Sequence, residues 1–334
     1  MDKLYLYAET AFHHEGDMEF MISLIDEAVK SGVNGVKFQV LTNPSDFVSS
    51  KHSSFKELSK YCFSIKDWKT IFSYATNNGL EIIFMPLNID SFNLLDDFKI
   101  KFIDIHSVSF NDQELVKKVK ESGLDVILGV GGRTQEEIAE KMSFFEGQVK
   151  VLMTGFQSFP SKLEKIKLSR IKFLKSLYPD ISIGYADHSS YDHEHSVVSN
   201  EYAYLLGARI FEKHITLIEG SNRVDAASAI SGEKLIQIKN NLDFLDKYIN
   251  LDQKESFVLG EEEKTYRNRQ LICVAGYDIP KGEIIRYSHI RMKMIDIVQN
   301  PVSEPNIIIG QVALDNIEKD EAITLNKLSI SRIK

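Results

Sequence analysis

Residues that could hold a metal ion stand at the ends of short apolar segments in this sequence. His188 and His214 each follow such a segment, preceded by Asp187 and Lys213, and Glu9 ends the first segment of the chain. Two imidazoles and a carboxylate with an open coordination position suit a divalent transition metal. One histidine at a strand end usually only caps it by hydrogen bonding, but two at the ends of successive segments favour a metal site.

Lys37 lies in the middle of another apolar segment, and Gln39 follows it two residues later. Burying an unpaired charge is costly, so a lysine here needs a partner or a function. It could bind a phosphate or a carboxylate, form a Schiff base, or make a structural ion pair with Glu9. We expect a functional role. Further polar candidates follow other apolar segments: Asp104, His106, Ser107 and Glu212.

These residues belong to an alternation of strand-like and helix-like segments. The strands are expected at Tyr5–Thr10, Gly35–Val40, Glu81–Pro86, Phe102–Ser107, Asp125–Val130, Val149–Thr154, Ile181–Asp187 and Arg209–Ile215. The helices are expected at Met18–Ser31, Ser64–Asn77, Asp112–Glu121, Thr134–Phe144, Arg170–Leu177, Glu194–Leu206 and Gly232–Tyr248. Eight βα units in about 250 residues predict a closed (β/α)₈ barrel. An open doubly wound sheet would have fewer strands and a glycine-rich first loop, which is missing here.

In a (β/α)₈ barrel the active site lies at the carboxyl ends of the strands. The seventh, eighth and first strands are neighbours once the barrel closes, so we expect His188, His214 and Glu9 to converge. Side chains alternate along a strand, which places Glu212 and His214 on one face and Lys213 on the other.

The chain is expected to divide into a barrel at residues 1–249, a linker at 250–268 and a small β-rich domain at 269–334. Within the last part, Asp278–Ile285 is echoed by Asn316–Ile323, which predicts two similar halves. A domain of this size is marginal alone, so we expect it to dock on another surface.

Composition describes an ordinary enzyme-like chain of 334 residues with a net charge of −8. It has no basic stripe interleaved with aromatic residues, so we expect no nucleic-acid partner. It also lacks an apolar run long enough for a membrane span and a signal-peptide pattern. Cys62 and Cys273 lie far apart in apolar segments, which predicts buried thiols in a reducing, cytoplasmic compartment.

Several of these pieces match known motifs in order and spacing. They read E-T-A-F-H-H-E-G at Glu9–Gly16, V-K-F-Q at Val36–Gln39, A-D-H-S at Ala186–Ser189, E-K-H-I-T at Glu212–Thr216 and D-I-P-K-G-E at Asp278–Glu283. With them, the chain resembles the sialic acid (nonulosonic acid) synthase family over nearly its whole length. Members of that family have a (β/α)₈ barrel followed by a small antifreeze-like (SAF) domain.

The resemblance implies an activity, a cofactor and an assembly. Such enzymes condense phosphoenolpyruvate with an open-chain N-acylated sugar, and a divalent metal, Mn²⁺ or Mg²⁺, polarises the sugar aldehyde. It implies a homodimer whose C-terminal domain caps the partner's barrel. The implied roles are metal ligands at His188 and His214, ordering of the metal's water by Glu9, donor contact by Lys37, and substrate binding by Gln39, His106, Ser107, Gln157, Asp187 and Asp225.

The donor-phosphate side departs from the family pattern. Asp104 stands where the family has a lysine and Ser109 where it has a glutamate, while Met85, Gly129, Ala186 and Met294 replace other polar family residues. Arg133, His106 or the backbone of 129–132 could supply replacement contacts for an anion. Three interpretations stay open: a nonulosonic acid synthase, a metal-dependent aldolase or lyase with a non-phosphorylated donor such as pyruvate, and a non-catalytic relative.

Overall fold

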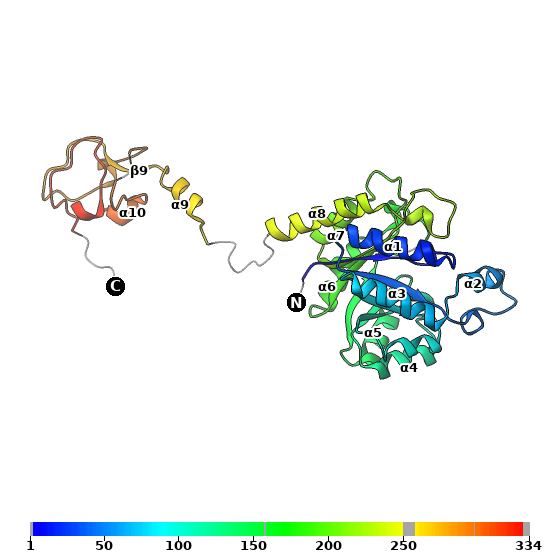
Figure 1. The fold of residues 1–334 in the computed structure, drawn as a ribbon. Helices are drawn as coiled ribbons and strands as arrows, with labels where there is room; N and C mark the ends of the chain where they lie inside the picture. The colour runs from blue at the N-terminus through cyan, green and yellow to red at the C-terminus, as the bar shows by residue number, and fades with distance from the viewer. Residues whose placement is uncertain (1–2, 157, 250–257, 297, 330–334) are drawn as a thin grey trace. The chain divides into compact units, whose positions relative to one another are not determined.

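The computed structural model describes residues 3–156, 158–249, 258–296 and 298–329. The chain forms two compact units, Met1–Ile249 and Asn250–Lys334. The first is a closed barrel of parallel strands in sequential order, as the alternation of segments predicts (Figure 1). Its strands are β1 (Tyr5–Glu9), β2 (Gly35–Val40), β3 (Glu81–Pro86), β4 (Ile100–Ile105), β5 (Val126–Gly129), β6 (Val149–Thr154), β7 (Ser182–Asp187) and β8 (Ala208–His214). Each lies within two residues of its expected bounds.

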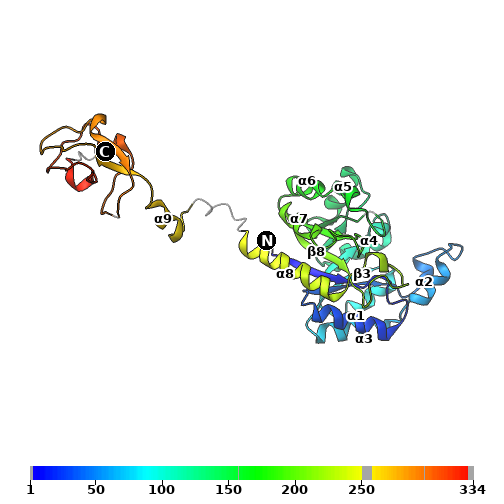
Figure 2. The same cartoon turned by 90° about the horizontal axis from the view of Figure 1, so that it is seen from above.

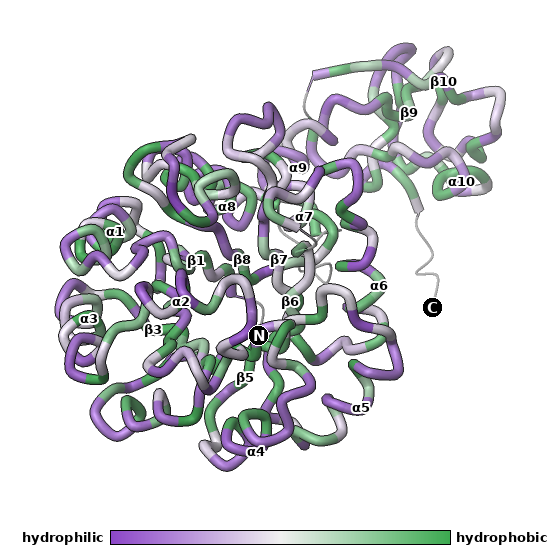
Figure 3. Tube along the Cα trace, turned by 90° about the vertical axis from the view of Figure 1, so that its right-hand side faces the viewer, coloured by the Kyte–Doolittle hydropathy of each residue, from purple (hydrophilic) through white to green (hydrophobic). Residues whose placement is uncertain are grey.

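Helices alternate with the strands and surround them, as the view in Figure 3 shows. They are α1 (Met18–Lys30), α3 (Ile65–Asn77), α4 (Gln113–Ser122), α5 (Gln135–Phe145), α6 (Ser169–Leu177), α7 (Ser199–Leu205) and α8 (Gly232–Tyr248). Short polar side chains start several of them: Asp17 caps α1, and reciprocal capping boxes open α3 at Ser64 and α5 at Thr134. Such caps satisfy backbone N–H groups that the first helical turn leaves unpaired.

Three details of the connections differ from expectation. Helix α2 (Phe55–Tyr61) lies between β2 and α3, has no buried residue, and stands away from the other helices in both views (Figures 1 and 2). A 3₁₀ helix at Ile89–Leu94 connects β3 to β4. Helix α7 begins at Ser199 and not at Glu194. These segments are too short or too polar to show a helical apolar period in the sequence.

The barrel unit has two apolar layers. Inside the strands lies a small core of Tyr5, Tyr7, Ile83, Phe102, Ile127, Val151, Met153, Ala186 and Ile210. A larger core fills the space between the outer faces of the strands and the helices, and includes Trp68, Phe72 and Leu242. The interior core ends below the carboxyl ends of the strands, where polar residues replace it. In the part of the chain that the structure describes, no helix is both long and apolar enough to span a membrane.

The second unit carries α9 (Glu261–Arg267), an antiparallel pair of strands, β9 (Ile272–Ala275) and β10 (Ile290–Lys293), and α10 (Pro305–Ile308). The two sequence repeats lie against each other at an antiparallel bridge between Ile279 and Ile317. Equivalent side chains cap the opposite repeat, because Asp278 Oδ1 accepts from the Lys319 N–H and Asn316 Oδ1 from the Lys281 N–H, both at 2.8 Å. A separate apolar core, including Cys273, Ile285 and Ile323, holds this unit together.

Candidate active site

An open pocket lies at the carboxyl ends of the barrel strands. It is lined by Glu9, Lys37, Gln39, Met85, Asp104, Ile105, His106, Ser107, Gly129, Gly131, Met153, Phe156, Phe159, Ala186, His188, Glu212 and His214. Parallel register explains why residues so distant in sequence meet: Glu9 is paired with Lys37 on β2 and with His214 on β8. This is the position at which (β/α)₈ enzymes bind their substrates.

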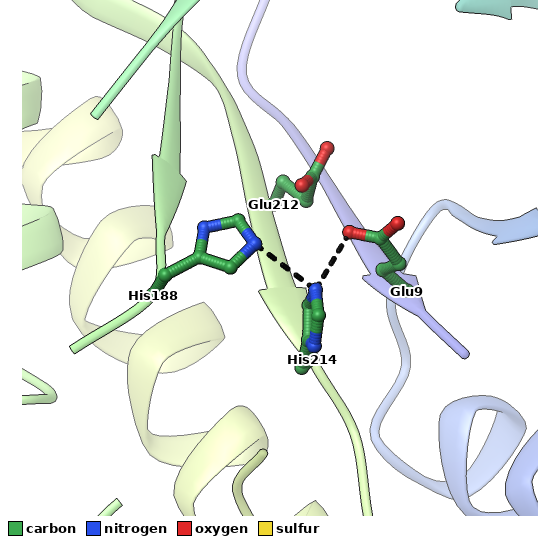
Figure 4. Close-up of side chains that lie close together, drawn as sticks. All are labelled: Glu9, His188, Glu212 and His214. Atoms are coloured by element: carbon green, nitrogen blue, oxygen red, sulfur yellow. Dashed lines mark hydrogen bonds and ion pairs between the residues drawn. The ribbon is translucent and has the colours of Figure 1, made fainter. Parts of the chain in front are cut away.

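Three ring and carboxylate atoms converge on the β7–β8–β1 side of this pocket (Figure 4). His188 Nε2 is 3.0 Å from His214 Nε2, and His214 Nε2 is 2.9 Å from Glu9 Oε2. With Glu212, these residues offer four ligand atoms that all lie within 4.8 Å of one another, and all four residues are buried. A buried set of two imidazoles and two carboxylates fits a divalent metal ion.

Lys37 lies directly beneath this cluster, inside the barrel. Its Nζ is 2.6 Å from Glu212 Oε2 and 3.2 Å from both Glu9 Oε2 and Asp104 Oδ2. The hydroxyl of Tyr7 donates to Glu212 Oε2 as well, at 2.6 Å. Lys37 is therefore shared by three carboxyl groups. The structural ion pair with Glu9 is present, together with two further ion pairs.

Burial and neighbouring charges shift the pKa values of these groups in different directions. Burial alone would raise the pKa of Glu9, but the Lys37 ammonium and His214 hold it well below its usual range. Burial and the Glu9 carboxylate raise the pKa of Glu212 well above its usual value, and burial also raises that of Asp104. Burial and the neighbouring His214 lower the pKa of His188, so its ring is neutral and its lone pair can bind a metal.

Two phenylalanines form an apolar wall beside the histidines. The ring centroid of Phe156 is 4.8 Å from that of His188, and Phe159 is 5.4 Å from His188 and 6.2 Å from His214. Phe159 is half exposed and reaches the open side of the pocket. An apolar wall next to polar ligands lowers the local dielectric constant and strengthens electrostatic contacts with a bound substrate.

The structure brings most of the predicted site residues together. Gln39, His106 and Ser107 line the pocket with the metal-binding candidates, and the Gln39 amide donates to Glu9 Oε1 at 2.8 Å. Asp225 is not among the lining residues that the structure describes; it lies in the loop after β8 with a left-handed backbone, φ 64°. Gln157 lies outside the described residues.

The predicted role of Asp187 in substrate binding is wrong. Its side chain is completely buried on the outer face of β7, where it pairs with Lys213 at 3.2 Å. Ser199 and Asn200 at the start of α7 donate to the same carboxylate. Strand alternation is the reason, because His188 points into the pocket and the residue before it must point away. Lys213 faces outward, as its position opposite Glu212 and His214 predicts.

The proposed replacements for the donor-phosphate contacts are only partly available. Arg133 Nη2 donates to the Ser107 carbonyl at 2.5 Å, and its guanidinium lies over the ring of Phe110, so it is not among the described lining residues. Burial lowers the pKa of His106 to about 4, which leaves its ring neutral near pH 7. Among the described residues, Lys37 is the one lysine or arginine that lines the pocket.

Two contributors to the site, Glu212 and Tyr7, have no role among the sequence predictions. Glu212 was recognised as facing inward but given no role, and Tyr7, its hydrogen-bond partner, was missed. The signal was present in both cases, since Glu212 precedes His214 by two residues and Tyr7 precedes Glu9 by two. Residues at that spacing share the face of a strand.

Comparisons with known proteins agree with this geometry. The model of the NeuB family matches residues 24–253. The chain is 25% identical to an N-acetylneuraminate-9-phosphate synthase of Drosophila melanogaster, over 98% of this chain and 96% of that one. It is 24% identical to an N,N'-diacetyllegionaminic acid synthase of Campylobacter jejuni, over 97% and 99%. An N-acetylneuraminic acid synthetase of Leptospira borgpetersenii, crystallised with citrate, superimposes with a TM-score of 0.71 at 25% identity, over 80% of this chain and 92% of that one.

Proposed function

Because this chain belongs to the NeuB family, we propose that it condenses phosphoenolpyruvate with an open-chain N-acylated amino sugar to give a nonulosonic acid, with a divalent metal bound. The observation that carries the proposal is the convergence of His188 Nε2, His214 Nε2 and Glu9 Oε2 at the pocket. Two relatives that match nearly the whole chain make acids of this class, by their names.

His188 and His214 would hold the metal, and Mn²⁺ or Mg²⁺ is the ion we propose. A bound divalent ion supplies Lewis acidity for the aldehyde oxygen of the acceptor. In the overall reaction, C3 of the donor forms a bond to the aldehyde carbon and the aldehyde oxygen takes a proton. Water adds to C2 of the donor, and inorganic phosphate leaves.

The chain's own residues position these reactants. Gln39 and Ser107 offer hydrogen bonds to the substrates from β2 and from the end of β4. Glu9 is ionised and fixed by Gln39, so it can hold a proton-donating ligand such as water or a hydroxyl at the pocket. Phe156 and Phe159 exclude water from one side of the acceptor. We also propose roles for Asp225 and His106 in substrate binding.

A second candidate follows from the surroundings of Lys37. Its ammonium is shared by Asp104, Glu212 and Glu9. A phosphate dianion needs charge-assisted donors to replace its water, and the acidic groups here oppose one. A condensation or cleavage that uses pyruvate is therefore the alternative, because pyruvate carries one carboxylate and no phosphate.

Two measurements distinguish the candidates. The full-length chain is incubated with Mn²⁺, N-acetylmannosamine or another N-acylated amino sugar, and either phosphoenolpyruvate or pyruvate; inorganic phosphate and the acid product are measured. We expect phosphate release that depends on the sugar and is lost in His214→Ala. Product formation with pyruvate alone would replace the first proposal by the second, and turnover with neither donor would contradict both.

Calorimetric titration with each donor, on the wild type and on Lys37→Ala, tests the donor site directly. We expect phosphoenolpyruvate binding in the wild type that Lys37→Ala loses, since a charged hydrogen bond contributes about 1.5–3 kcal/mol. Binding that Lys37→Ala leaves unchanged would contradict the donor role of Lys37.

For the second unit, we propose a SAF-type domain at residues 269–334 that caps the pocket of a partner copy in a homodimer. The paired repeats and the independent core of this unit support a small folded module. Helix α9 lies within the expected linker at 250–268. Met294, one of the positions at which the chain departs from the family pattern, is exposed on this unit.

A further inference from the structure

The contacts of His214 are hard to explain without an ion. Its Nε2 atom is 3.0 Å from His188 Nε2 and 2.9 Å from Glu9 Oε2. A ring nitrogen has one in-plane direction, used by either a proton or a lone pair, so it cannot make two good hydrogen bonds. His188 Nε2 and Glu9 Oε2 thus both crowd onto His214 Nε2 in a way that hydrogen bonding alone does not require.

The spacing of these atoms matches ligands on a common ion. Two ligands at right angles on a six-coordinate ion with bonds of about 2.1 Å lie about 3.0 Å apart. Two ligands on a tetrahedral ion with the same bonds lie about 3.4 Å apart. The two measured separations of 3.0 and 2.9 Å agree with the six-coordinate arrangement.

The second glutamate of the cluster is engaged elsewhere. Glu212 Oε2 accepts from the Tyr7 hydroxyl and from Lys37 Nζ, each at 2.6 Å, which are its shortest contacts. Glu9 differs in degree: Gln39 donates to its Oε1 at 2.8 Å, and its Oε2 lies closer to His214 Nε2, at 2.9 Å, than to Lys37 Nζ, at 3.2 Å. Figure 4 shows the same difference, with an interaction drawn from Glu9 to His214 and none from Glu212 to either histidine.

The ring of His188 is also oriented for ligation. Its Nδ1 is 3.2 Å from the Ala186 carbonyl oxygen, so a proton on Nδ1 can be donated there. That tautomer leaves the Nε2 lone pair directed at the cluster. Metal-binding histidines usually donate their other ring N–H to a carbonyl or carboxylate in this way.

We propose that Glu9 is itself a metal ligand, and that His188 Nε2, His214 Nε2 and Glu9 Oε2 are three ligands of a six-coordinate divalent metal site. Glu212 stays outside the coordination shell and anchors Lys37. Two histidines and one carboxylate leave three positions for oxygen atoms of substrate or water, an arrangement suited to Mn²⁺ and Fe²⁺. This inference rests on the metal requirement of the proposed function but not on its substrates.

The test measures binding of the metal alone. The full-length chain is freed of metal with a chelator and titrated with Mn²⁺. Calorimetry and electron paramagnetic resonance of free Mn²⁺ measure the binding. Glu9→Gln is compared with two controls, Glu212→Gln and Asp104→Asn. Each variant removes one buried carboxyl group that contacts Lys37, and only Glu9→Gln removes the proposed ligand.

We expect Glu9→Gln to raise the Mn²⁺ dissociation constant at least about tenfold more than either control. A smaller difference in dissociation constant between Glu9→Gln and the controls, or a larger loss of Mn²⁺ affinity in Glu212→Gln, overturns the assignment. If Glu9→Gln does not fold by circular dichroism, Glu9→Asp replaces it, because it keeps the charge but retracts the carboxylate, and the same difference is required.

Cobalt substitution tests the coordination number independently. Co²⁺ bound to the wild type should show the weak visible absorption of a six-coordinate ion. Intense bands of a tetrahedral site would overturn the six-coordinate arrangement. Neither readout needs turnover, so the metal assignment can fail while the condensation reaction stands, and the reverse also holds.

Discussion

Asp187 and Lys213 form an ion pair of 3.2 Å between the ends of β7 and β8, and both side chains are completely buried. Each precedes a histidine of the candidate metal site, and the two residues are paired in the register of the strands. The pair lies on the outer face of the barrel while the histidines point inward. It therefore fixes the relative position of the two strand ends from which His188 and His214 extend.

Lys213→Met should destabilise the protein strongly, because it leaves the Asp187 carboxylate buried without its partner. Removing one partner of a buried pair costs about 3–5 kcal/mol. The free energy of unfolding, measured in urea, checks this value. Lys234→Met is the matched control, since Lys234 pairs with Glu219 at 2.8 Å but is partly exposed, and pairs of that kind contribute about 1 kcal/mol or less. Equal losses in the two variants would contradict the role of burial.

His188→Ala and His214→Ala should each abolish retention of Mn²⁺ and leave the barrel folded. Both rings lie at strand ends above the apolar interior core, so their loss removes ligands and little core packing. Metal content after gel filtration, with circular dichroism alongside, makes the measurement. His195→Ala, in the exposed loop after β7, is the control and should keep its metal. Unchanged metal content in both site variants would refute the assignment.

His14 should make the protein sensitive to acid. Its ring stacks on Phe63 with centroids 4.7 Å apart, and its buried Nε2 has no hydrogen-bond partner in the structure. Burial, with smaller contributions from His13 and Arg223, lowers its pKa from 6.5 to about 3. Between these values the unfolded chain binds a proton that the folded chain does not, so stability present above pH 6.5 is lost as pH falls toward 3.

His14→Gln removes this titration and should flatten the pH dependence. Between pH 6 and 5 the free energy of unfolding of the wild type should fall more steeply than that of the variant, by about 1.4 kcal/mol per pH unit. Urea unfolding at several pH values gives both slopes, and groups common to both proteins cancel in the comparison. Parallel slopes would show that His14 is protonated in the folded state.

Truncation after Leu259 should separate the assembly role of the second unit from folding of the first. The barrel unit has its own core, so residues 1–259 should fold and retain metal. If the second unit caps a partner's pocket, light scattering should show a dimer for the full chain, and the truncated chain should lose its turnover. A full-length monomer whose activity survives truncation would contradict the proposed dimer.

Much of the fold is predictable from the sequence because strands and helices have distinct apolar periods. Eight apolar segments of strand length, separated by amphipathic ones, predict a closed parallel barrel, and all eight strands are found. Helix α2 and the late start of α7 were not predictable, since α2 buries no residue and α7 begins where Ser199 and Asn200 bind Asp187. Those hydrogen bonds run to Asp187 at the end of β7, so they leave no apolar period in the sequence of α7 itself.

The sequence by itself determined the order of the strands, the face on which His188, His214 and Glu9 lie, and hence their approach at the β7–β8–β1 junction. Period-two alternation and barrel closure suffice for this. Only the tertiary structure decided how Lys37 is used, because its carboxylate partners come from β1, β4 and β8 at a depth set by strand stagger. It also decided that Asp187 pairs with Lys213 from the neighbouring strand, where burial makes an unpaired charge too costly and each ion must have its partner.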